Sequence, residues 1–316
     1  MMKKKVFVGV DTSNYTTSLA ILSMEGELIA NLKRPLPVKE GECGLRQSDA
    51  VFHHTVNFPK LTSAARPILS EYDVAAIGVS TRPRNVEGSY MPCFLVGVSV
   101  AESLSLGCGA PIHRFSHQCG HIMATVYSAG REDLLAAPFA AFHISGGTTE
   151  LVRAELIDGE FKSELIGKTA DLNAGQVIDR IGVRLGLAFP AGVELEKLAL
   201  LNNKKIPKRK VSVNGTSVNL SGLENMAIKL YEQTEDRPLV AAFVLNYISS
   251  ALRALMSAYR ERYGDDPFVF AGGVMSNTII RKELSQLGDC SFAEPELSRD
   301  NAVGIAALAR RKHLCI

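Results

Sequence analysis

Two segments far apart in the chain share one plan: an apolar strand, a small polar turn and a second strand. In "KVFVGVDTSNYTTSLAIL" the strands are expected at 6–10 and 17–22. In "PFAAFHISGGTTELVRAEL" they are expected at 139–144 and 150–156. Each segment is typical of a β-hairpin with Ser, Thr or Gly at its tip. The repetition predicts that the chain folds as two similar halves.

Helix-length amphipathic stretches separate these strands, as in "VGVSVAESLSLGCG" and "RPLVAAFVLNYISSALRALMSAYRERYG". Strands that alternate with helices indicate an α/β fold whose sheets are covered by helices. A chain of 316 residues, 46% of them hydrophobic, can build two such domains with separate cores. We therefore expect one domain at 1–136 and a second at 137–299. The tail "SRDNAVGIAALARRKHL" predicts a helix within about 300–316 that packs on the first domain and is capped by Ser298 or Asp300.

The overall composition excludes several classes of protein. Lys and Arg total 35 and Asp and Glu total 33, so a nucleic-acid contact needs a local basic patch rather than bulk charge. No apolar run reaches the roughly 20 residues that span a bilayer, and the start "MMKKKVFVGV" continues as a strand rather than a signal peptide. We expect a cytoplasmic protein without a membrane partner. The cysteines form no CxxC pair, which favours a reducing compartment over a disulfide framework. They are Cys43, Cys93, Cys108, Cys119, Cys290 and Cys315.

One segment is more basic than the rest of the chain. "NNKKIPKRKVSVNGTSVNLSG", at 202–222, predicts an exposed basic loop that leads into a pair of strands. Such a loop is either an ordinary solvated loop or a patch that binds a phosphate backbone, and composition does not decide between them. Its basic residues are Lys204, Lys205, Lys208, Arg209 and Lys210.

Glycine turns follow apolar runs at several points. The tip Ser145-Gly146-Gly147-Thr148 and the turn in "FVFAGGVMSN" present backbone N–H groups without an intruding Cβ, which lets a phosphate approach. One such turn is common, whereas three in one chain, two of them on repeated hairpins, are more specific. The pattern resembles the superfamily of sugar kinases, Hsp70 and actin. That resemblance implies two RNase H-like domains with a nucleotide and metal cleft between them.

Two histidines four residues apart, His117 and His121, stand in "RFSHQCGH". On a helix this spacing puts both imidazoles on one face, which suits a single divalent metal ion. The alternative is a helix with one structural and one exposed histidine, and the spacing alone does not exclude it. Zinc peptidases of the HExxH type carry a glutamate as general base after the first histidine. That position is Gln118 here, which argues against a metallopeptidase.

Eight short motifs occur in order along nearly the whole chain. They are "DTSNYTTS", "LVGVSVAESLS", "HQCGH", "ISGGTTEL", "GKTADLNAGQVIDR", "PAGVELEKLA", "FAGGVMSN" and "DNAVGIA". In sequence and order they resemble the motifs of the tRNA threonylcarbamoyladenosine transferases, the TsaD/Kae/Qri family once called O-sialoglycoprotein endopeptidase or glycoprotease M22. The chain is identified as a divergent member of this family.

The resemblance implies a metal centre. The family's ligands match His117, His121 and Asp300, and His143 stands where some members have a tyrosine ligand. We therefore expect one divalent ion held by three histidines and an aspartate. Nitrogen-rich ligation favours zinc or iron over magnesium.

The resemblance also implies a site for an adenine nucleotide, which would be ATP, AMP or an adenylate. Two of the implied contacts have other interpretations that remain open. Asp179 can be a helix-surface partner of Arg180, and Glu196 can support Lys197 and its helix. The implied contacts are Ser145, Gly146 and Gly147 to phosphate, Asp179 and Glu196 to ribose, Gly192 against the ligand, and Gly272, Gly273 and Asn277 to adenine and ribose.

The reaction that the resemblance implies is transfer of a threonylcarbamoyl group from an adenylate to N6 of a tRNA adenine. The metal would act as a Lewis acid, the glycine turns would hold the AMP phosphate, and the basic segment at 202–222 would contact tRNA. Family members pair through helices of the N-terminal domain, so we expect a homologous subunit or a homodimer.

The chain departs from the family pattern near this site. Asn14, Tyr15 and Thr16 replace a small residue and two acids in the first hairpin, and Cys119 replaces the glutamate of HxEGH. These losses leave open a divergent paralogue that binds nucleotide and metal without performing the transfer, or a scaffold subunit.

Two further departures lie outside these motifs. "TRPRN" at 81–85 stands in place of TRGPG, so both glycines are lost and Arg84 is added near Arg82. This pair either binds an additional anionic group or forms an ordinary exposed turn. Of the family's ExxxRxH motif, only the histidine remains, as His53.

Overall fold

A computed structural model describes residues 3–13, 15–37 and 45–316. The chain falls into two compact units that interleave along the sequence. Unit 1 comprises Met1–Glu132, Leu156–Lys162 and Arg299–Ile316, and unit 2 comprises Asp133–Glu155 and Ser163–Ser298. The division into domains at 1–136 and 137–299 stays a prediction.

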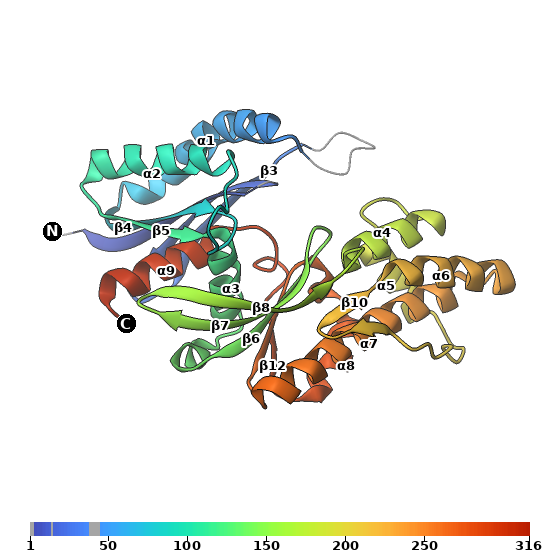
Figure 1. Cartoon of the computed structure of the whole chain (residues 1–316). Helices are drawn as coiled ribbons and strands as arrows, with labels where there is room; N and C mark the ends of the chain where they lie inside the picture. Colours follow the sequence, from blue (N-terminus) through green and yellow to red (C-terminus); the bar gives the residue numbers. More distant parts are fainter. Residues whose placement is uncertain (1–2, 14, 38–44) are drawn as a thin grey trace. The chain divides into compact units, whose positions relative to one another are not determined.

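Helices and strands alternate in both units, as the sequence predicts for an α/β fold (Figure 1). The elements that begin within Met1–Glu132 or Arg299–Ile316 are β1 (Lys4–Ser13), β2 (Thr16–Ser23), β3 (Leu28–Pro35), α1 (Gln47–Leu69), β4 (Tyr72–Arg82), α2 (Phe94–Cys108), β5 (Ile112–Ser116), α3 (His117–Ser128), a 3-10 turn (Glu132–Ala136) and α9 (Val303–Leu314). The others are β6 (Phe139–Ile144), β7 (Thr149–Ile157), β8 (Glu160–Thr169), α4 (Ala174–Arg184), α5 (Gly192–Leu200), β9 (Ser212–Asn214), β10 (Ser217–Asn219), α6 (Ser221–Thr234), α7 (Arg237–Tyr263), β11 (Phe268–Ala271), a 3-10 turn (Gly273–Ser276), α8 (Thr278–Leu284), a 3-10 turn (Ser285–Leu287) and β12 (Cys290–Phe292).

The sheet of unit 1 has the order β3-β2-β1-β4-β5. Strands β1 and β2 form the predicted antiparallel hairpin, with Val10 opposite Leu19. Strand β1 also pairs with β4 in parallel. Alternate residues of a strand point to opposite faces. Val8 and its neighbours two residues away pack toward α1 and α2, whereas Gly9 lies against α9. This alternation puts Asp11, two residues after Gly9, on the α9 face of the sheet.

Helix α9 lies directly on the sheet because two strand residues lack a Cβ. A Cβ at Gly9 would lie 2.3 Å from the Ala302 carbonyl oxygen, and one at Gly78 would lie 2.5 Å from the Ile305 carbonyl oxygen. The prediction that Ser298 or Asp300 caps this helix is wrong. Helix α9 begins later, at Val303, whose N–H donates to the side chain of Asn301 at 2.9 Å.

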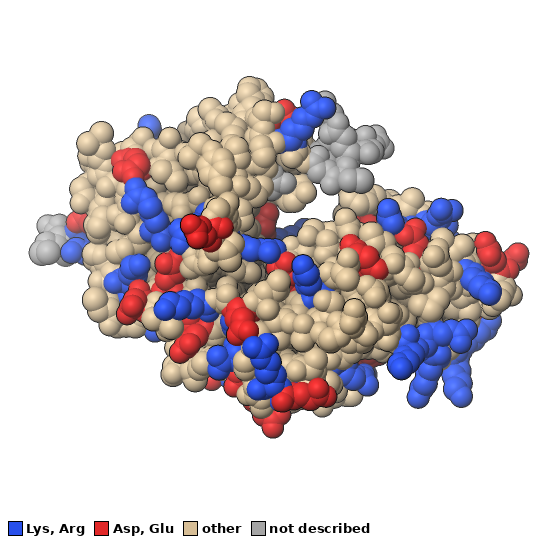
Figure 2. Space-filling view, viewed as in Figure 1, with Lys and Arg blue, Asp and Glu red and all other residues tan. Residues whose placement is uncertain are grey.

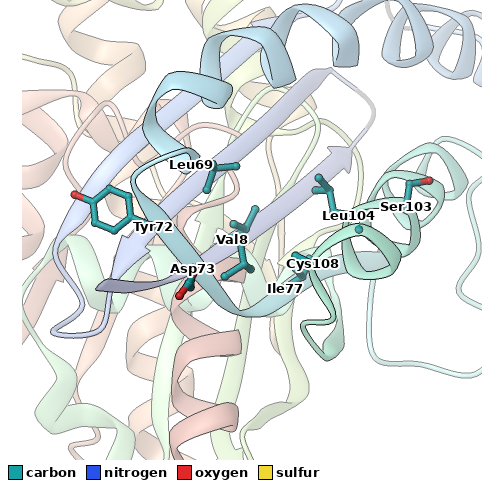
Figure 3. Close-up of a pocket in the computed structure, with 10 residues that line it drawn as sticks. Val8, Leu69, Tyr72, Asp73, Ile77, Ser103, Leu104 and Cys108 are labelled. Carbon is teal, nitrogen blue, oxygen red and sulfur yellow. The ribbon is translucent and has the colours of Figure 1, made fainter. Parts of the chain in front are cut away.

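The opposite face of the same sheet contains a cavity of about 480 Å³ (Figure 3). Val8 and Ile77 from the strands, Leu69 at the end of α1, and Leu104 and Cys108 of α2 are among the residues that line it. The lining is mostly apolar, because α1 and α2 cover this face of the sheet.

The sheet of unit 2 has the order β12-β11-β6-β7-β8-β10-β9. The second predicted hairpin is present, with Phe142 opposite Leu151, and so is the predicted strand pair β9/β10, with Asn214 opposite Ser217. Helix α7 is the one described helix that is long and apolar enough to cross a membrane. Its apolar side chains, such as Phe243 and Leu252, are buried within unit 2, so α7 is a core helix.

Candidate metal centre and glycine turns

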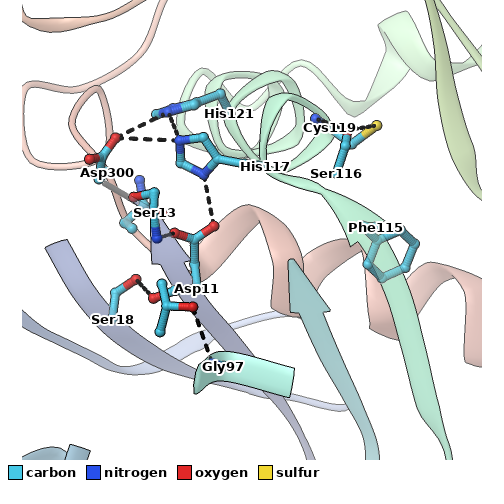
Figure 4. A network of polar contacts seen from close by, with 12 residues as sticks. Asp11, Ser13, Ser18, Gly97, Phe115, Ser116, His117, Cys119, His121 and Asp300 are labelled. Atoms are coloured by element: carbon cyan, nitrogen blue, oxygen red, sulfur yellow. Dashed lines mark hydrogen bonds and ion pairs between the residues drawn. The ribbon is translucent and has the colours of Figure 1, made fainter. Parts of the chain in front are cut away.

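Helix α3 brings the two histidines together at its first turn. Strand β5 ends at Ser116, whose hydroxyl accepts the Cys119 N–H at 3.2 Å and so caps the helix. His117 and His121 then lie on one face, with their Nε2 atoms 2.9 Å apart (Figure 4). His121 is 7% exposed.

Asp300 reaches this pair from the segment that precedes α9. Its Oδ1 lies 3.6 Å from Nε2 of His117 and 3.2 Å from Nε2 of His121. The approach depends on close contact between α3 and α9. A Cβ on Gly304 would lie 1.9 Å from the Gly120 carbonyl oxygen.

The three donor atoms suit one metal ion. They are the only such group of three found among the described His, Cys, Asp and Glu side chains. Ligands at ~2.0–2.1 Å in a tetrahedron lie about 3.3 Å apart, and the separations here are 2.9, 3.2 and 3.6 Å. Side chains of His117 and Asp300 keep 18% and 22% exposure, which leaves a side open to an exchangeable ligand. Two imidazoles and one carboxylate favour zinc or iron over magnesium.

Asp11 supports this centre, and sequence reasoning missed it. Its carboxylate is fully buried, and Oδ2 lies 2.8 Å from Nδ1 of His117, while Oδ1 accepts the Ser13 N–H at 2.9 Å. A carboxylate that holds the outer ring nitrogen fixes the orientation of a metal-binding histidine. An acid directly after the buried run "VFVGV" was the available signal.

The carboxylates on either side of His117 govern its charge. Burial alone would lower the pKa of His117, but Asp11 and Asp300 outweigh that effect and raise it to about 10. Burial likewise opposes ionisation of Asp300, yet hydrogen bonds from His117 and His121 hold its pKa well below the usual value. Without a metal ion, the centre therefore holds an imidazolium between two carboxylates at neutral pH.

Cys119 faces away from the ligands. Its thiol lies 3.1 Å from the Ser116 hydroxyl and 3.5 Å from the Phe161 carbonyl oxygen, on the other side of α3 (Figure 4). The loss of the family's glutamate at this position therefore does not remove a group that faces the histidines. In the "TRPRN" turn, Arg82 forms an ion pair with Glu160 at 3.0 Å and also hydrogen-bonds Asn85.

In unit 2 the Ser145–Gly147 turn is closed by its own side chain. The Ser145 hydroxyl accepts the N–H groups of Gly147 and Thr148 at 3.3 and 3.1 Å. Gly175 supports the turn from below, since a Cβ there would lie 2.6 Å from the Gly146 nitrogen. A Cβ on Gly146 or Gly147 would meet nothing within 4 Å, so the outer side of the turn is open.

Both alternative interpretations of the acids are wrong. Asp179 accepts the Ala191 N–H at 2.8 Å, whereas Arg180 pairs with Glu224. Burial raises the pKa of Asp179. Glu196 accepts the N–H and hydroxyl of Thr278 at the start of α8, and Lys197 pairs with Glu194 instead. Each acid thus holds backbone next to an expected ligand contact.

The second glycine turn also divides into structural and open positions. Gly272 has φ +97°, and a Cβ there would lie 2.2 Å from the Ile144 carbonyl oxygen, so packing requires glycine. Asn277 is 7% exposed and caps α8 by accepting the Ile280 N–H at 3.0 Å. A Cβ on Gly273 would meet no atom within 4 Å, and one on Gly192 would meet only Ile178, at 3.9 Å. The nucleotide contacts assigned to these residues stay predictions.

The remaining expected residues are placed as follows. His143 lies on β6 in unit 2, and its assignment as a fourth metal ligand stays a prediction. Tyr15 is 42% exposed at the end of the first hairpin, whereas Asn14 and Cys43 lie outside the described residues. The five basic residues of the 202–222 segment are all exposed, and Figure 2 shows Lys and Arg side chains gathered over the loop before β9. Lys204 is paired with Asp236 at 2.7 Å.

Comparison with known proteins decides the family. The family described as TsaD, tRNA N6-adenosine threonylcarbamoyltransferase, matches residues 44–307. The chain belongs to this family. A relative named tRNA N6-adenosine threonylcarbamoyltransferase from Streptococcus suis (strain 05ZYH33) is 28% identical over 321 residues, covering 98% of this chain and 92% of the relative. The similarity therefore extends over nearly all of both proteins.

Solved structures agree on the fold. HypF of T. kodakarensis has a TM-score of 0.63 at 14% identity over 99% of this chain, which spans about half (48%) of that longer protein. A ROK family glucokinase from Streptomyces griseus has a TM-score of 0.52 at 15% identity, covering 97% of this chain and 99% of the kinase. The TsaD-family chain therefore has a two-domain α/β fold like that of the ROK family glucokinase, in agreement with the fold class that the sequence predicts.

Proposed function

We propose that this TsaD-family protein transfers a threonylcarbamoyl group from an adenylate to N6 of a tRNA adenine. The observation that carries the proposal is the convergence of His117, His121 and Asp300, the residues that the family resemblance assigns to the metal. Asp11 contacts His117 from the side opposite the other two ligands. At 28% identity to the Streptococcus suis relative, the family alone leaves the substrate to be tested.

The residues of the centre have separate tasks in this reaction. His117, His121 and Asp300 would hold a zinc or iron ion, which when bound supplies Lewis acidity toward the threonylcarbamoyl group. Asp11 accepts the Nδ1 proton of His117, which leaves Nε2 on the side of His121 and Asp300, where it would be available to the metal. The buried side chain of His121 keeps water away from one side, while the exposed edge of Asp300 admits substrate.

The open glycine positions support an adenylate site in unit 2. Gly146, Gly147 and Gly273 have free space where a side chain would stand, so a phosphate or sugar can approach the backbone there. The glucokinase with the same fold was solved in complex with glucose and AMPPNP, which supports a nucleotide here. The group that leaves with the broken anhydride bond is AMP, and the new bond joins the carbamoyl carbon to N6.

Two surfaces support macromolecular partners. The exposed basic loop at 204–210 suits the tRNA backbone, because phosphate contacts position a protein on nucleic acid. Helices α1 and α2 expose apolar side chains, with Phe52 at 63%, Val56 at 43% and Leu95 at 53%, which supports a second subunit on this face of unit 1.

A second candidate function rests on the first hairpin. Tyr15 and Thr16 stand where the family has acids, so a paralogue that binds nucleotide and metal without the transfer, or a scaffold subunit, is the alternative.

A direct assay separates the two. Purified, metal-loaded protein is incubated with threonylcarbamoyl adenylate and unmodified tRNA, with and without a homologous subunit, and tRNA nucleosides are measured by mass spectrometry. We expect modified adenosine with the wild type and background levels with the double variant His117→Ala, His121→Ala. Bound metal and bound nucleotide without any modified adenosine would favour the paralogue.

A further inference from the structure

A histidine outside the ligand set lies buried beside the hairpin that carries Asp11. His54 on α1 is fully buried, and both of its ring nitrogens are engaged. Nε2 lies 2.9 Å from the Ser13 carbonyl oxygen in β1, and Nδ1 lies 2.8 Å from the Thr17 hydroxyl in β2. One side chain therefore joins the two strands at the turn end of the hairpin.

The partners determine which nitrogen carries the proton. A carbonyl oxygen only accepts, so Nε2–H donates to Ser13 and Nδ1 accepts from Thr17. The Thr17 hydroxyl has one proton to donate, which goes to Nδ1, while its oxygen accepts from the Asn57 amide at 3.2 Å. Burial lowers the pKa of His54, in keeping with the neutral ring that this network needs.

Ser13 links His54 to the metal centre. The residue whose carbonyl His54 holds also donates its N–H to Oδ1 of Asp11 at 2.9 Å, and Oδ2 of the same carboxylate holds His117 at 2.8 Å. These consecutive contacts, two of which Figure 4 shows, run from α1 to the first ligand and all lie in unit 1. The hairpin is secured from α2 as well, where the Gly97 N–H donates to Thr12.

We infer that His54 is a positioning residue: its bond to Ser13 fixes the hairpin end so that Asp11 holds His117 in the orientation that binds metal. The inference rests on the metal centre of the proposed function. Nothing in the transfer reaction requires His54 to touch substrate.

Two variants of similar size separate positioning from general packing. His54→Gln places an amide N–H where Nε2 stands and can keep the Ser13 bond. His54→Asn places an amide oxygen where Nδ1 stands and can keep only the Thr17 bond. Outer-shell changes cost about 10–100-fold in metal affinity, so we expect His54→Asn to weaken Co²⁺ binding by about tenfold and His54→Gln by much less.

The measurement is titration of the metal-free full chain with Co²⁺, followed by visible absorption, with Zn²⁺ competition and urea unfolding of each variant. Equal Co²⁺ affinity for the wild type and both folded variants would overturn the inference and leave the proposed function intact. Equal weakening in both variants would overturn it too, since packing rather than the Ser13 bond would then matter. No Co²⁺ or Zn²⁺ binding by the wild type would overturn the metal centre itself and His54's role with it.

Discussion

The metal centre of unit 1 and the glycine turns of unit 2 use their polar side chains in opposite ways. In unit 1, His117, His121 and Asp300 point their donor atoms at one another. In unit 2, the side-chain oxygens of Asp179 and Asn277 instead accept hydrogen bonds from backbone N–H groups. The difference teaches that a site can be built from convergent side chains, or from backbone that side chains hold in place while glycines stay open.

Gly304→Ala should have the largest effect on the convergence of His117, His121 and Asp300. A Cβ there would lie 1.9 Å from a backbone oxygen of α3, so α9 must move and take Asp300 with it. We expect the free energy of unfolding to fall by about 3 kcal/mol, the upper end for overpacking, and metal binding to be lost. Urea unfolding and metal analysis of the purified protein measure both.

Gly107→Ala is the matched control for that variant. Gly107 lies in α2, and an added Cβ there would meet nothing within 4 Å. The change should stabilise the protein by about 0.5–1 kcal/mol through helix propensity. Equal effects of the two substitutions would show that the contact between α3 and α9 does not hold the centre together.

Removing the charge of Asp11, whose carboxylate contacts Nδ1 of His117, should have the next largest effect. Asp11→Asn keeps the shape of the side chain, but the carboxylate that orients the ring is gone, so we expect zinc affinity to fall about 10–100-fold. Competition with a chromophoric chelator measures it. Cys119→Ser, on the other face of the same helix, should leave the affinity unchanged.

The charge of His117 predicts a pH dependence. Its pKa is raised to about 10 in the metal-free protein, so a metal ion must displace a proton from Nε2 at neutral pH. Zinc affinity should therefore rise about tenfold per pH unit between pH ~6.5 and ~9. Calorimetry in buffers of different ionisation enthalpy should detect about one released proton. A flat affinity profile would contradict the imidazolium between two carboxylates.

The raised pKa of His117 should make the stability of the metal-free protein fall as the pH rises, whereas zinc affinity should increase. Because the folded pKa exceeds the ordinary value of 6.5, protonated His117 stabilises the metal-free protein fully below pH 6.5. That contribution should disappear as the pH rises through about 10. Urea unfolding at both ends of this range, with His117→Ala as reference, measures it.

The smallest expected effect concerns unit 2. Asn277→Ala removes the cap of α8 and should lower the free energy of unfolding by about 1 kcal/mol. Asn203→Ala, on an exposed loop, should change it by no more than about 0.5 kcal/mol. Unchanged stability with lost nucleotide binding in Asn277→Ala would contradict the proposed difference between the two units. Asn277 would then contact the ligand rather than stabilise α8.

Much of the fold could be predicted because it depends on residue patterns within short segments of the sequence. The two hairpins, the β9/β10 pair and the α/β class follow from strand periodicity and turn residues. The facing of His117 and His121 follows from helical spacing. The same spacing puts Cys119 about 200° from His117, so its outward direction was also available from the sequence.

What escaped prediction depends on contacts between distant residues. Asp11 and His117 are 106 positions apart, and only the α/β register brings them together. Glu196 meets Thr278 across 82 positions, which a neighbour such as Lys197 cannot reveal. The start of α9 was mispredicted because the helix begins only at Val303, whose N–H donates to the side chain of Asn301 rather than to Ser298 or Asp300.

The order of the elements along the chain has a consequence for biosynthesis. Helix α9 completes unit 1, yet it is translated after all of unit 2. On the ribosome, the face of β1 and β4 that carries Gly9 and Gly78 must therefore stay uncovered while unit 2 emerges, which makes it a surface for a chaperone to shield. An ion that needs His117, His121 and Asp300 together can be captured only by chains whose synthesis has passed residue 300.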